Sequence, residues 1–142
     1  MTKEQLATMA KEAMKHAYSP YSGYKVGAAL LSKDGSVYTG CNVENASFSA
    51  TNCAERTAFF KAISEGKREF AAIAICGGKD GVIEGLFPPC GVCRQVMREF
   101  CDDEFEIYLI TANGIETYTL GQLLPVSFRP ETITSLYCDS IL

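Results

Sequence analysis

Two short stretches, Asn52-Cys53-Ala54-Glu55-Arg56 and Pro88-Pro89-Cys90-Gly91-Val92-Cys93, carry the most informative pattern in this sequence. One cysteine is followed 37 positions later by a Cys-x-x-Cys pair, and an acid stands two residues after the first cysteine. Structural zinc sites usually have four protein ligands, whereas catalytic zinc sites have three and keep a fourth position open. The pattern therefore predicts a catalytic zinc site with Cys53, Cys90 and Cys93 as its ligands.

Both stretches are expected at the N-terminal ends of helices. Asn52 is a plausible N-cap for a helix from Cys53 to about Ser64. A second helix is expected from about Gly91 to Phe100, and one of its faces carries Val92, Val96 and Phe100. The positive ends of two helix dipoles would then lie at the thiols. They lower the thiol pKa and favour the thiolate, which is the form that binds metal.

Two charged residues are expected to act at this site. Arg56 would donate hydrogen bonds to a thiolate and offset the formal −1 charge that three thiolates leave on Zn²⁺. Glu55 could take a proton from water at the open position without binding the metal. Asn52-x-x-Glu55 is also nearly a capping box, in which Glu55 would only bind a backbone N–H. That stretch alone leaves both interpretations open; the Cys-x-x-Cys pair favours catalysis, because an open three-ligand site needs a base.

The rest of the chain alternates between helix and strand patterns. An amphipathic helix is expected over residues 3–17, and a hairpin is expected from Val26–Leu31 and Val37–Cys41. Further strands are expected at Ala71–Cys76, Phe105–Ile110 and Glu116–Leu120, with loops at residues 42–50 and 77–89. The alternation predicts an α/β fold, a three-layer α/β/α sandwich with a mixed central β-sheet, in a single domain spanning residues 1–142.

Composition limits the function classes. With 142 residues, 47% of them apolar, the chain is long enough to bury a core. A net charge of −4 and the absence of any Lys/Arg run argue against nucleic acid as a partner. No apolar run is long enough to span a bilayer, so no membrane partner is expected. The N-terminus is polar from the start and does not resemble a signal peptide, so the expected location is cytoplasmic.

The seven cysteines leave two other interpretations open. A disulfide framework is not expected of an odd number in a reducing compartment. A thioredoxin-like redox pair would explain Cys-x-x-Cys but would leave Cys53 without a role. A structural zinc module, which would be non-catalytic, needs a fourth ligand. Cys41, Cys76, Cys101 and Cys138 are available; the first three are expected to be small buried hydrophobes, and Cys138 could not be placed.

Taken together, these motifs resemble one enzyme family. Cys53-Ala54-Glu55-Arg56 with Pro89-Cys90-Gly91-Val92-Cys93-Arg94-Gln95 is similar to the small, homotetrameric cytidine deaminases, whose superfamily signature is H-x-E…P-C-x-x-C. Cys53 stands in place of the histidine. The similarity extends over nearly the whole chain, through residues 18–22, 26–29, 40–46 and 123–125.

The resemblance implies an activity. It implies zinc-dependent hydrolytic deamination of cytidine and 2′-deoxycytidine to uridine and 2′-deoxyuridine in pyrimidine salvage, with one Zn²⁺ per subunit. Glu55 would move protons from water to N3 of the pyrimidine and to the departing amine. Deamination of a cytosine-nucleoside antibiotic is the alternative within the same superfamily.

The resemblance also implies how the nucleoside is held. Asn42 and Glu44 would bind the ribose 3′-hydroxyl, and the Ala54 N–H would bind the carbonyl of the base. Ala46 belongs to the same matching segment and is expected at the substrate. Tyr24 stands where the family typically has a phenylalanine that packs on the base, so its hydroxyl needs a partner.

Two further aromatic residues are implied at subunit contacts. Phe48 and Phe128 match positions that reach into the active site of a neighbouring subunit. The resemblance therefore implies a homotetramer with shared active sites. From the sequence alone, packing in the core of their own chain is the alternative for both residues.

Overall fold

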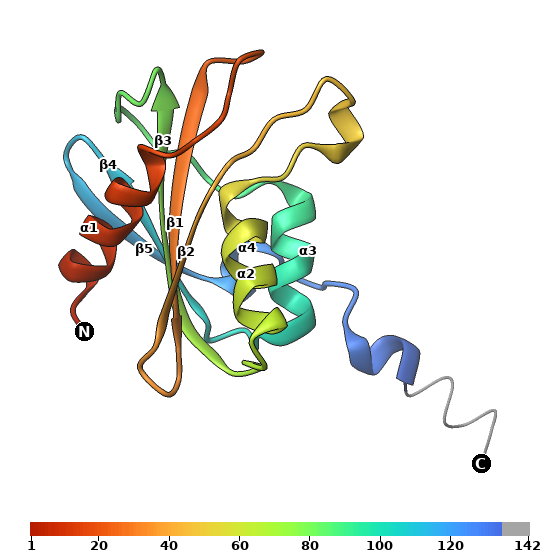
Figure 1. The fold of residues 1–142 in the computed structure, drawn as a ribbon. Coiled ribbons are helices and arrows are strands. Elements are labelled where there is room, and N and C mark those ends of the chain that lie inside the picture. The colour runs from red at the N-terminus through yellow and green to blue at the C-terminus, as the bar shows by residue number, and fades with distance from the viewer. Residues whose placement is uncertain (135–142) are drawn as a thin grey trace.

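A mixed five-stranded sheet forms the middle of the protein, in the order β2-β1-β3-β4-β5 (Figure 1). The computed structural model describes residues 1–134. The strands are β1 (Tyr24–Ser32), β2 (Val37–Cys41), β3 (Phe70–Lys79), β4 (Glu106–Thr111) and β5 (Gly114–Thr119). Only β3 and β4 pair in parallel, because the chain crosses over between them, and the other neighbours are antiparallel.

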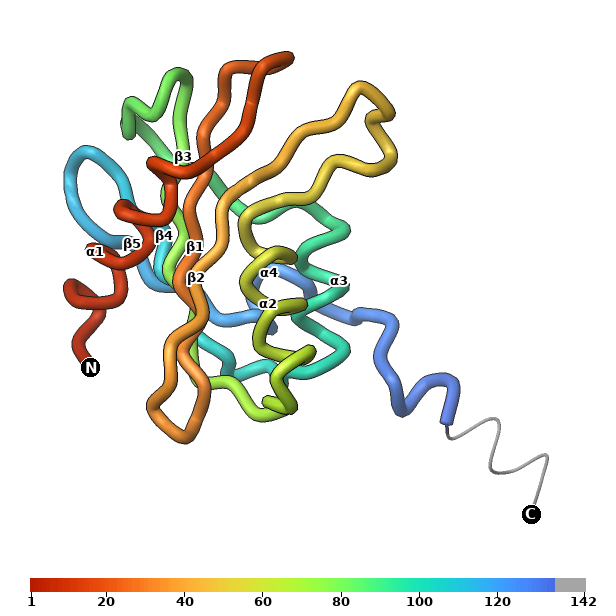
Figure 2. The backbone as a smooth tube through the Cα atoms, in the orientation of Figure 1, coloured from red at the N-terminus to blue at the C-terminus, as the bar shows by residue number. Residues whose placement is uncertain are grey.

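Helices cover both faces of this sheet. The helix α1 (Lys3–Met14) packs on one face, and α2 (Ala54–Ser64) and α3 (Gly91–Phe100) pack on the other, with the short α4 (Leu120–Leu123) beside them (Figures 1 and 2). Each face has its own apolar cluster. The predicted three-layer α/β/α sandwich with a mixed sheet is therefore confirmed. No helix in residues 1–134 has both the length and the apolar character needed to cross a bilayer.

The two faces of the sheet differ in side-chain size. The face toward α2 and α3 carries large residues such as Leu30, Ile73 and Ile75, whereas the face toward α1 carries small ones such as Ala29 and Ala74. Glycine extends this close packing. A Cβ at Gly27 would lie 2.1 Å from Ala10 O in α1, and a Cβ at Gly40 would lie 2.5 Å from Ala54 O in α2. Both helices thus rest directly on the backbone of the hairpin.

Some element bounds differ from the prediction. The first helix ends at Met14, three residues before the expected residue 17. The strand β3 continues through Gly77 and Gly78 to Lys79, where a loop was expected, because these glycines pair with β1. A Cβ at Gly77 would lie 2.8 Å from the ring of Phe87, and one at Gly78 would lie 1.8 Å from Val82 O. The glycines here permit close contact with residues 82–87 and do not mark a turn.

The starts of the two site helices also differ in detail. Cys53, not Asn52, is the N-cap of α2, and the Asn52 amide donates instead to Thr57 Oγ1 at 3.0 Å. The capping-box interpretation of Glu55 is therefore wrong. In α3 the expected face is shifted, because Val92 is exposed while Cys93 and Met97 are buried against the sheet.

Candidate metal centre

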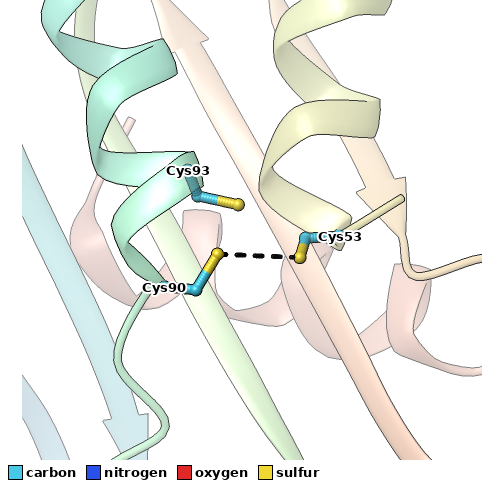
Figure 3. A group of neighbouring side chains, drawn as sticks. All are labelled: Cys53, Cys90 and Cys93. Atoms are coloured by element: carbon cyan, nitrogen blue, oxygen red, sulfur yellow. Dashed lines mark hydrogen bonds between the residues drawn. The ribbon is translucent and has the colours of Figure 1, made fainter. Parts of the chain in front are cut away.

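Three sulfur atoms meet where α2 and α3 begin. Cys53 is the N-cap of α2, Cys90 is the N-cap of α3, and Cys93 lies in the first turn of α3. Their Sγ atoms all lie within 4.8 Å of one another, and those of Cys53 and Cys90 are 3.9 Å apart (Figure 3). The side chains point toward a common centre from two helix ends, whose unpaired N–H groups favour negative charge there.

The arrangement fits a zinc ion. Zn–S bonds of about 2.3 Å in tetrahedral geometry put sulfurs about 3.8 Å apart, close to the 3.9 Å between Cys53 and Cys90. Within residues 1–134, no other Cys, His, Asp or Glu joins this group, so the described part of the chain supplies three ligands and leaves a fourth position open. The fourth ligand of a structural zinc module is thus not found among these residues.

The spare cysteines lie elsewhere. Cys76 is on the sheet face covered by α1, with its Sγ 3.9 Å from Met14 Sδ. Cys101 follows the far end of α3. Burial raises the pKa of Cys76 to about 11 and that of Cys101 to about 12, so both stay protonated at neutral pH. Cys41 ends β2 and is partly exposed, and Cys138 lies outside the described residues.

Arg56 contacts the cluster as predicted. Its Nη2 donates a hydrogen bond to Cys53 Sγ at 3.3 Å. A hydrogen bond from Cys93, together with the charge and hydrogen bond of Arg56, lowers the pKa of Cys53 to about 5. The same shared proton raises the pKa of Cys93, so the two thiols titrate as a pair. At neutral pH the Cys53 thiolate therefore carries a negative charge. A bound metal cation would replace the proton that Cys53 and Cys93 share.

Glu55 lies beside the sulfurs in a dry environment. Its side chain is only 4% exposed, and its Oε1 is buried without a hydrogen-bond partner in the described residues. Burial, and secondly the negative charge of Cys53, raises the pKa of Glu55 to about 7. A carboxyl group with this pKa can both accept and donate a proton at neutral pH.

Asn42 and Glu44 anchor the loop that follows β2. The Asn42 amide donates to Tyr24 O and its Oδ1 accepts from Val26 N–H, both at 2.8 Å. The Glu44 carboxylate accepts from the Ser22 hydroxyl and from the N–H groups of Tyr21 and Ser22. These bonds, first that of the Ser22 hydroxyl, lower the pKa of Glu44 and keep it charged.

Three other predicted substrate contacts lie near these segments. Tyr24 is exposed, with its ring 6.1 Å from that of Phe87 and 5.4 Å from Lys79 Nζ, and these residues line a cavity of about 420 Å³. Ala54 is the first residue of α2, where a helix N–H has no partner within the helix. Ala46 is exposed in the loop between β2 and α2.

Phe48 and Phe128 are both outside the core. Phe48 is 78% exposed at the start of a short 3-10 helix, Phe48–Ala50, in the loop between β2 and α2, and its ring centroid lies 6.3 Å from that of Tyr21 in an edge-to-face arrangement. Phe128 is 57% exposed after α4. Packing in the core of their own chain, the alternative that the sequence left open, is therefore wrong for both.

Sequence reasoning assigned no role to three residues of α3, although two of them, Arg94 and Gln95, stand in the motif that resembles the family. The side chain of Arg94 donates a hydrogen bond to the carbonyl of Leu123, the last residue of α4, and those of Gln95 and Arg98 donate to carbonyls in the segment that follows α4. A carbonyl acceptor has no residue-type signal, so the sequence offered only the polar face of the helix as a hint. A larger cavity of about 460 Å³, around Phe100, Cys101 and Phe105, contains none of the predicted site residues.

Three sulfurs around an open position, with a buried acid beside them, are typical of zinc-dependent hydrolases. The chain belongs to the cytidine and deoxycytidylate deaminase family, because the model of its zinc-binding region matches residues 1–109. The family that the motifs predicted is thereby confirmed, and with it the enzyme class and the zinc cofactor.

Relatives and solved structures agree with this assignment. A cytidine deaminase of Sporosarcina psychrophila is 48% identical over 135 residues, which cover 94% of this chain and 96% of that protein. One of Halalkalibacterium halodurans is 49% identical over 132 residues, covering 92% and 97%. The crystal structure of cytidine deaminase from Burkholderia pseudomallei has a TM-score of 0.84 at 48% identity, covering 90% of this chain and 100% of that one.

Proposed function

We propose that this protein hydrolyses cytidine and 2′-deoxycytidine to uridine and 2′-deoxyuridine with the release of ammonia, as a zinc-dependent step of pyrimidine salvage. The observation that carries the proposal is the buried Glu55, whose free oxygen lies beside three sulfurs with an open fourth position. The relatives described above, which are named cytidine deaminases, support the substrate.

Glu55 is the group that moves protons. Zinc, when bound, supplies a Lewis acid that makes water reactive at neutral pH. Glu55 accepts a proton from the attacking water and passes it to N3 of the base. It then takes the proton of the hydroxyl newly bonded to C4 and passes it to the exocyclic amine, which leaves as ammonia while the C4 carbonyl forms. A pKa near 7 suits both directions of transfer. Arg56 holds the Cys53 sulfur and offsets the charge of the thiolates.

The nucleoside is held by groups from the start of β1, the loop after β2 and the start of α2. Asn42 and Glu44 bind the ribose 3′-hydroxyl; each Asn42 amide atom makes one backbone bond and keeps capacity for another. The Ala54 N–H binds the base carbonyl, Tyr24 stacks on the base, and Ala46 lines the same segment. The negative charge of Glu44 disfavours phosphate near the sugar, so free nucleosides are preferred to monophosphates.

The active form is a homotetramer with shared active sites. Exposed Phe48 and Phe128 support this, because large aromatic rings outside the core are characteristic of interfaces. Each ring enters the site of a neighbouring subunit. The proposal treats residues 1–142 as one catalytic domain that acts in the cytoplasm on a small nucleoside, with neither nucleic acid nor membrane as a partner.

Loss of the ultraviolet band of cytidine on addition of purified protein tests the activity. Cytidine, deoxycytidine, their monophosphates and a cytosine-nucleoside antibiotic are compared, with and without a chelator. Glu55→Gln is expected to retain zinc and the fold but to lose turnover. Near-normal turnover in that variant, or coordination of zinc by four sulfurs in X-ray absorption, would contradict the proposal.

Mixed assemblies test the shared sites. Phe128→Ala is expected to raise KM about two- to tenfold, the value of one aromatic contact. When this variant is co-expressed with a Glu55→Gln chain that carries a different tag, its active sites receive Phe128 from the inactive chain. The KM of the mixed assembly is therefore expected to return to the wild-type value. A KM that stays at the Phe128→Ala value would show that Phe128 acts within its own subunit or not at all.

A further inference from the structure

Side chains of α3 bind the last residue of α4 and the chain that follows it. Arg94 Nη1 donates to Leu123 O at 2.6 Å, and Gln95 Nε2 donates to Phe128 O at 2.8 Å. Each of these donors lies on α3 close to the ligand Cys93, so the helix that carries two metal ligands also holds the segment that ends in Phe128.

A second anchor holds the other side of Phe128. The buried Arg98, only 3% exposed, donates to Asp103 Oδ1 at 2.6 Å, and Arg129 donates to the same oxygen at 3.1 Å. Arg98 also donates to Leu124 O at 3.4 Å. Arg129, the residue after Phe128, is thus linked through Asp103 to the buried Arg98 of α3. The Phe128 carbonyl is bound to α3 by Gln95.

Between these anchors the backbone has an unusual conformation. Val126 has a φ of 50°, which is rare for a β-branched residue and costs energy unless the surroundings impose it. The Val126 and Phe128 side chains are exposed, whereas Ser127 Oγ between them is buried. Two residues after the kink, Phe128 thus leaves its side chain exposed while its carbonyl accepts a hydrogen bond from Gln95.

We propose that Gln95 is a positioning residue that presents the Phe128 ring to the active site of a neighbouring subunit. The inference rests on the shared sites of the proposed function and adds the device that fixes the ring. Because Gln95 holds Phe128 of its own chain, its loss affects the neighbour's site. Gln95 is two residues from Cys93, so the competing explanation is that its loss disturbs the metal site of its own subunit. The two explanations differ in whether the variant subunit or its neighbour has the impaired active site.

Gln95→Ala tests the first part. Loss of one hydrogen bond is expected to raise KM for cytidine about two- to tenfold, with kcat and zinc content close to wild type. The matched control is Glu99→Ala, which changes an exposed residue one turn further along α3 and is expected to leave KM unchanged. A wild-type KM for Gln95→Ala, or loss of zinc from it, would overturn the inference.

Co-assembly with Glu55→Gln chains tests the direction of the effect. The active sites of Gln95→Ala subunits then receive a correctly held Phe128 from their inactive neighbours, so KM is expected to return to wild type. If KM stays raised although the Phe128→Ala mixture is rescued, Gln95 acts in its own subunit and the inference fails while the shared site stands. If neither mixture is rescued, the shared site itself fails, and the role of Gln95 with it.

A backbone variant provides an independent test. Val126→Pro forces φ to about −65° and is incompatible with the observed kink. It is expected to raise KM and to be rescued by Glu55→Gln chains in the same way. Val126→Asn, which tolerates a positive φ, is expected to have a lower KM than Val126→Pro. Equal KM values for these two variants would contradict a role for the kink.

Discussion

At the scale of single residues, burial of the Glu55 carboxyl group lowers the stability of the fold but suits the group to proton transfer. Burial, and secondly the negative charge of Cys53, disfavours the charged form of this carboxylate, which is why its pKa rises to about 7. A fold selected for stability alone would place an apolar residue there. The proposed role in proton transfer, and not packing, would account for an acid at this position.

The raised pKa predicts how stability depends on pH after zinc is removed with a chelator. The folded state binds the Glu55 proton more tightly than the unfolded state, whose pKa is near 4.5. Stability from this group is thus full below pH 4.5 and is lost as pH rises toward 7, by about 3 kcal/mol at most. Glu55→Gln should lack this loss and be the more stable protein at pH 8. Urea unfolding at pH 4 and pH 8 in reductant measures it, and parallel pH profiles would refute it.

Arg56 has a different residue-scale consequence. Arg56→Gln removes the donor to Cys53 Sγ and the charge that offsets the thiolates. Activity should fall about 10- to 100-fold, as is common for groups that support a metal ligand, with zinc still bound. Kinetics and zinc content measure the effect, and Arg68→Gln, which changes an exposed arginine after the far end of α2, is the control. Unchanged kinetics in Arg56→Gln would rule out this role.

Site residues could be predicted from the sequence where the proposed chemistry requires one particular kind of side chain. Three thiols, one acid and Arg56 could be found because metal binding and proton transfer each need particular side chains. Asn52 was misassigned as the cap, because the helix begins one residue later: Cys53 stands at the N-cap position without a side-chain cap bond, and the Asn52 amide donates to Thr57. Gln95 was missed because its partner is a carbonyl, which every residue offers.

At the scale of elements, the close contact of helices with the hairpin sets the position of the site. A Cβ at Gly40 would meet Ala54 O and Ala58 N of α2, whereas one at Gly27 would meet Ala10 O and Met14 N of α1. Cys53 stands at the start of α2, whereas α1 carries no ligand. Substitution at Gly40 should therefore affect both stability and metal binding, and substitution at Gly27 should affect stability alone.

Alanine at each glycine gives a matched pair of variants. Overpacking of this kind costs about 1–3 kcal/mol, and both Gly27→Ala and Gly40→Ala should lower the free energy of unfolding. Only Gly40→Ala should also weaken zinc binding, because it displaces the helix that holds Cys53. Urea unfolding and competition with a chromophoric chelator measure the two effects. Equal zinc affinities in the two variants would contradict this account.

Element types could be predicted better than their ends. The strand Val37–Cys41 and the helix Gly91–Phe100 follow the predicted bounds, because apolar pattern and flanking turns agree there. The end of β3 was misplaced, because glycine signals a turn in sequence but here permits close packing. The pairing order of strands depends on contacts between distant segments, and no local pattern contains it.

At the scale of the whole molecule, the metal site lies at the edge of a core that is apolar without it. Two clusters on opposite faces of the sheet bury most of the large side chains. Chelation of zinc should therefore lower the midpoint of thermal unfolding but leave the far-ultraviolet circular dichroism unchanged. Restoring zinc should return the midpoint. Loss of the helical signal on chelation would show that the metal holds the fold together, as in a structural zinc module.

The ligands themselves are far apart in the chain. Cys53 and Cys90 are separated by 37 residues, and the whole of β3 lies between them. In the folded protein, packing of α2 and α3 on the sheet holds these sulfurs together, so we expect folding to precede metal binding. If so, protein made without zinc should be a folded but inactive apoprotein that regains activity when zinc is added.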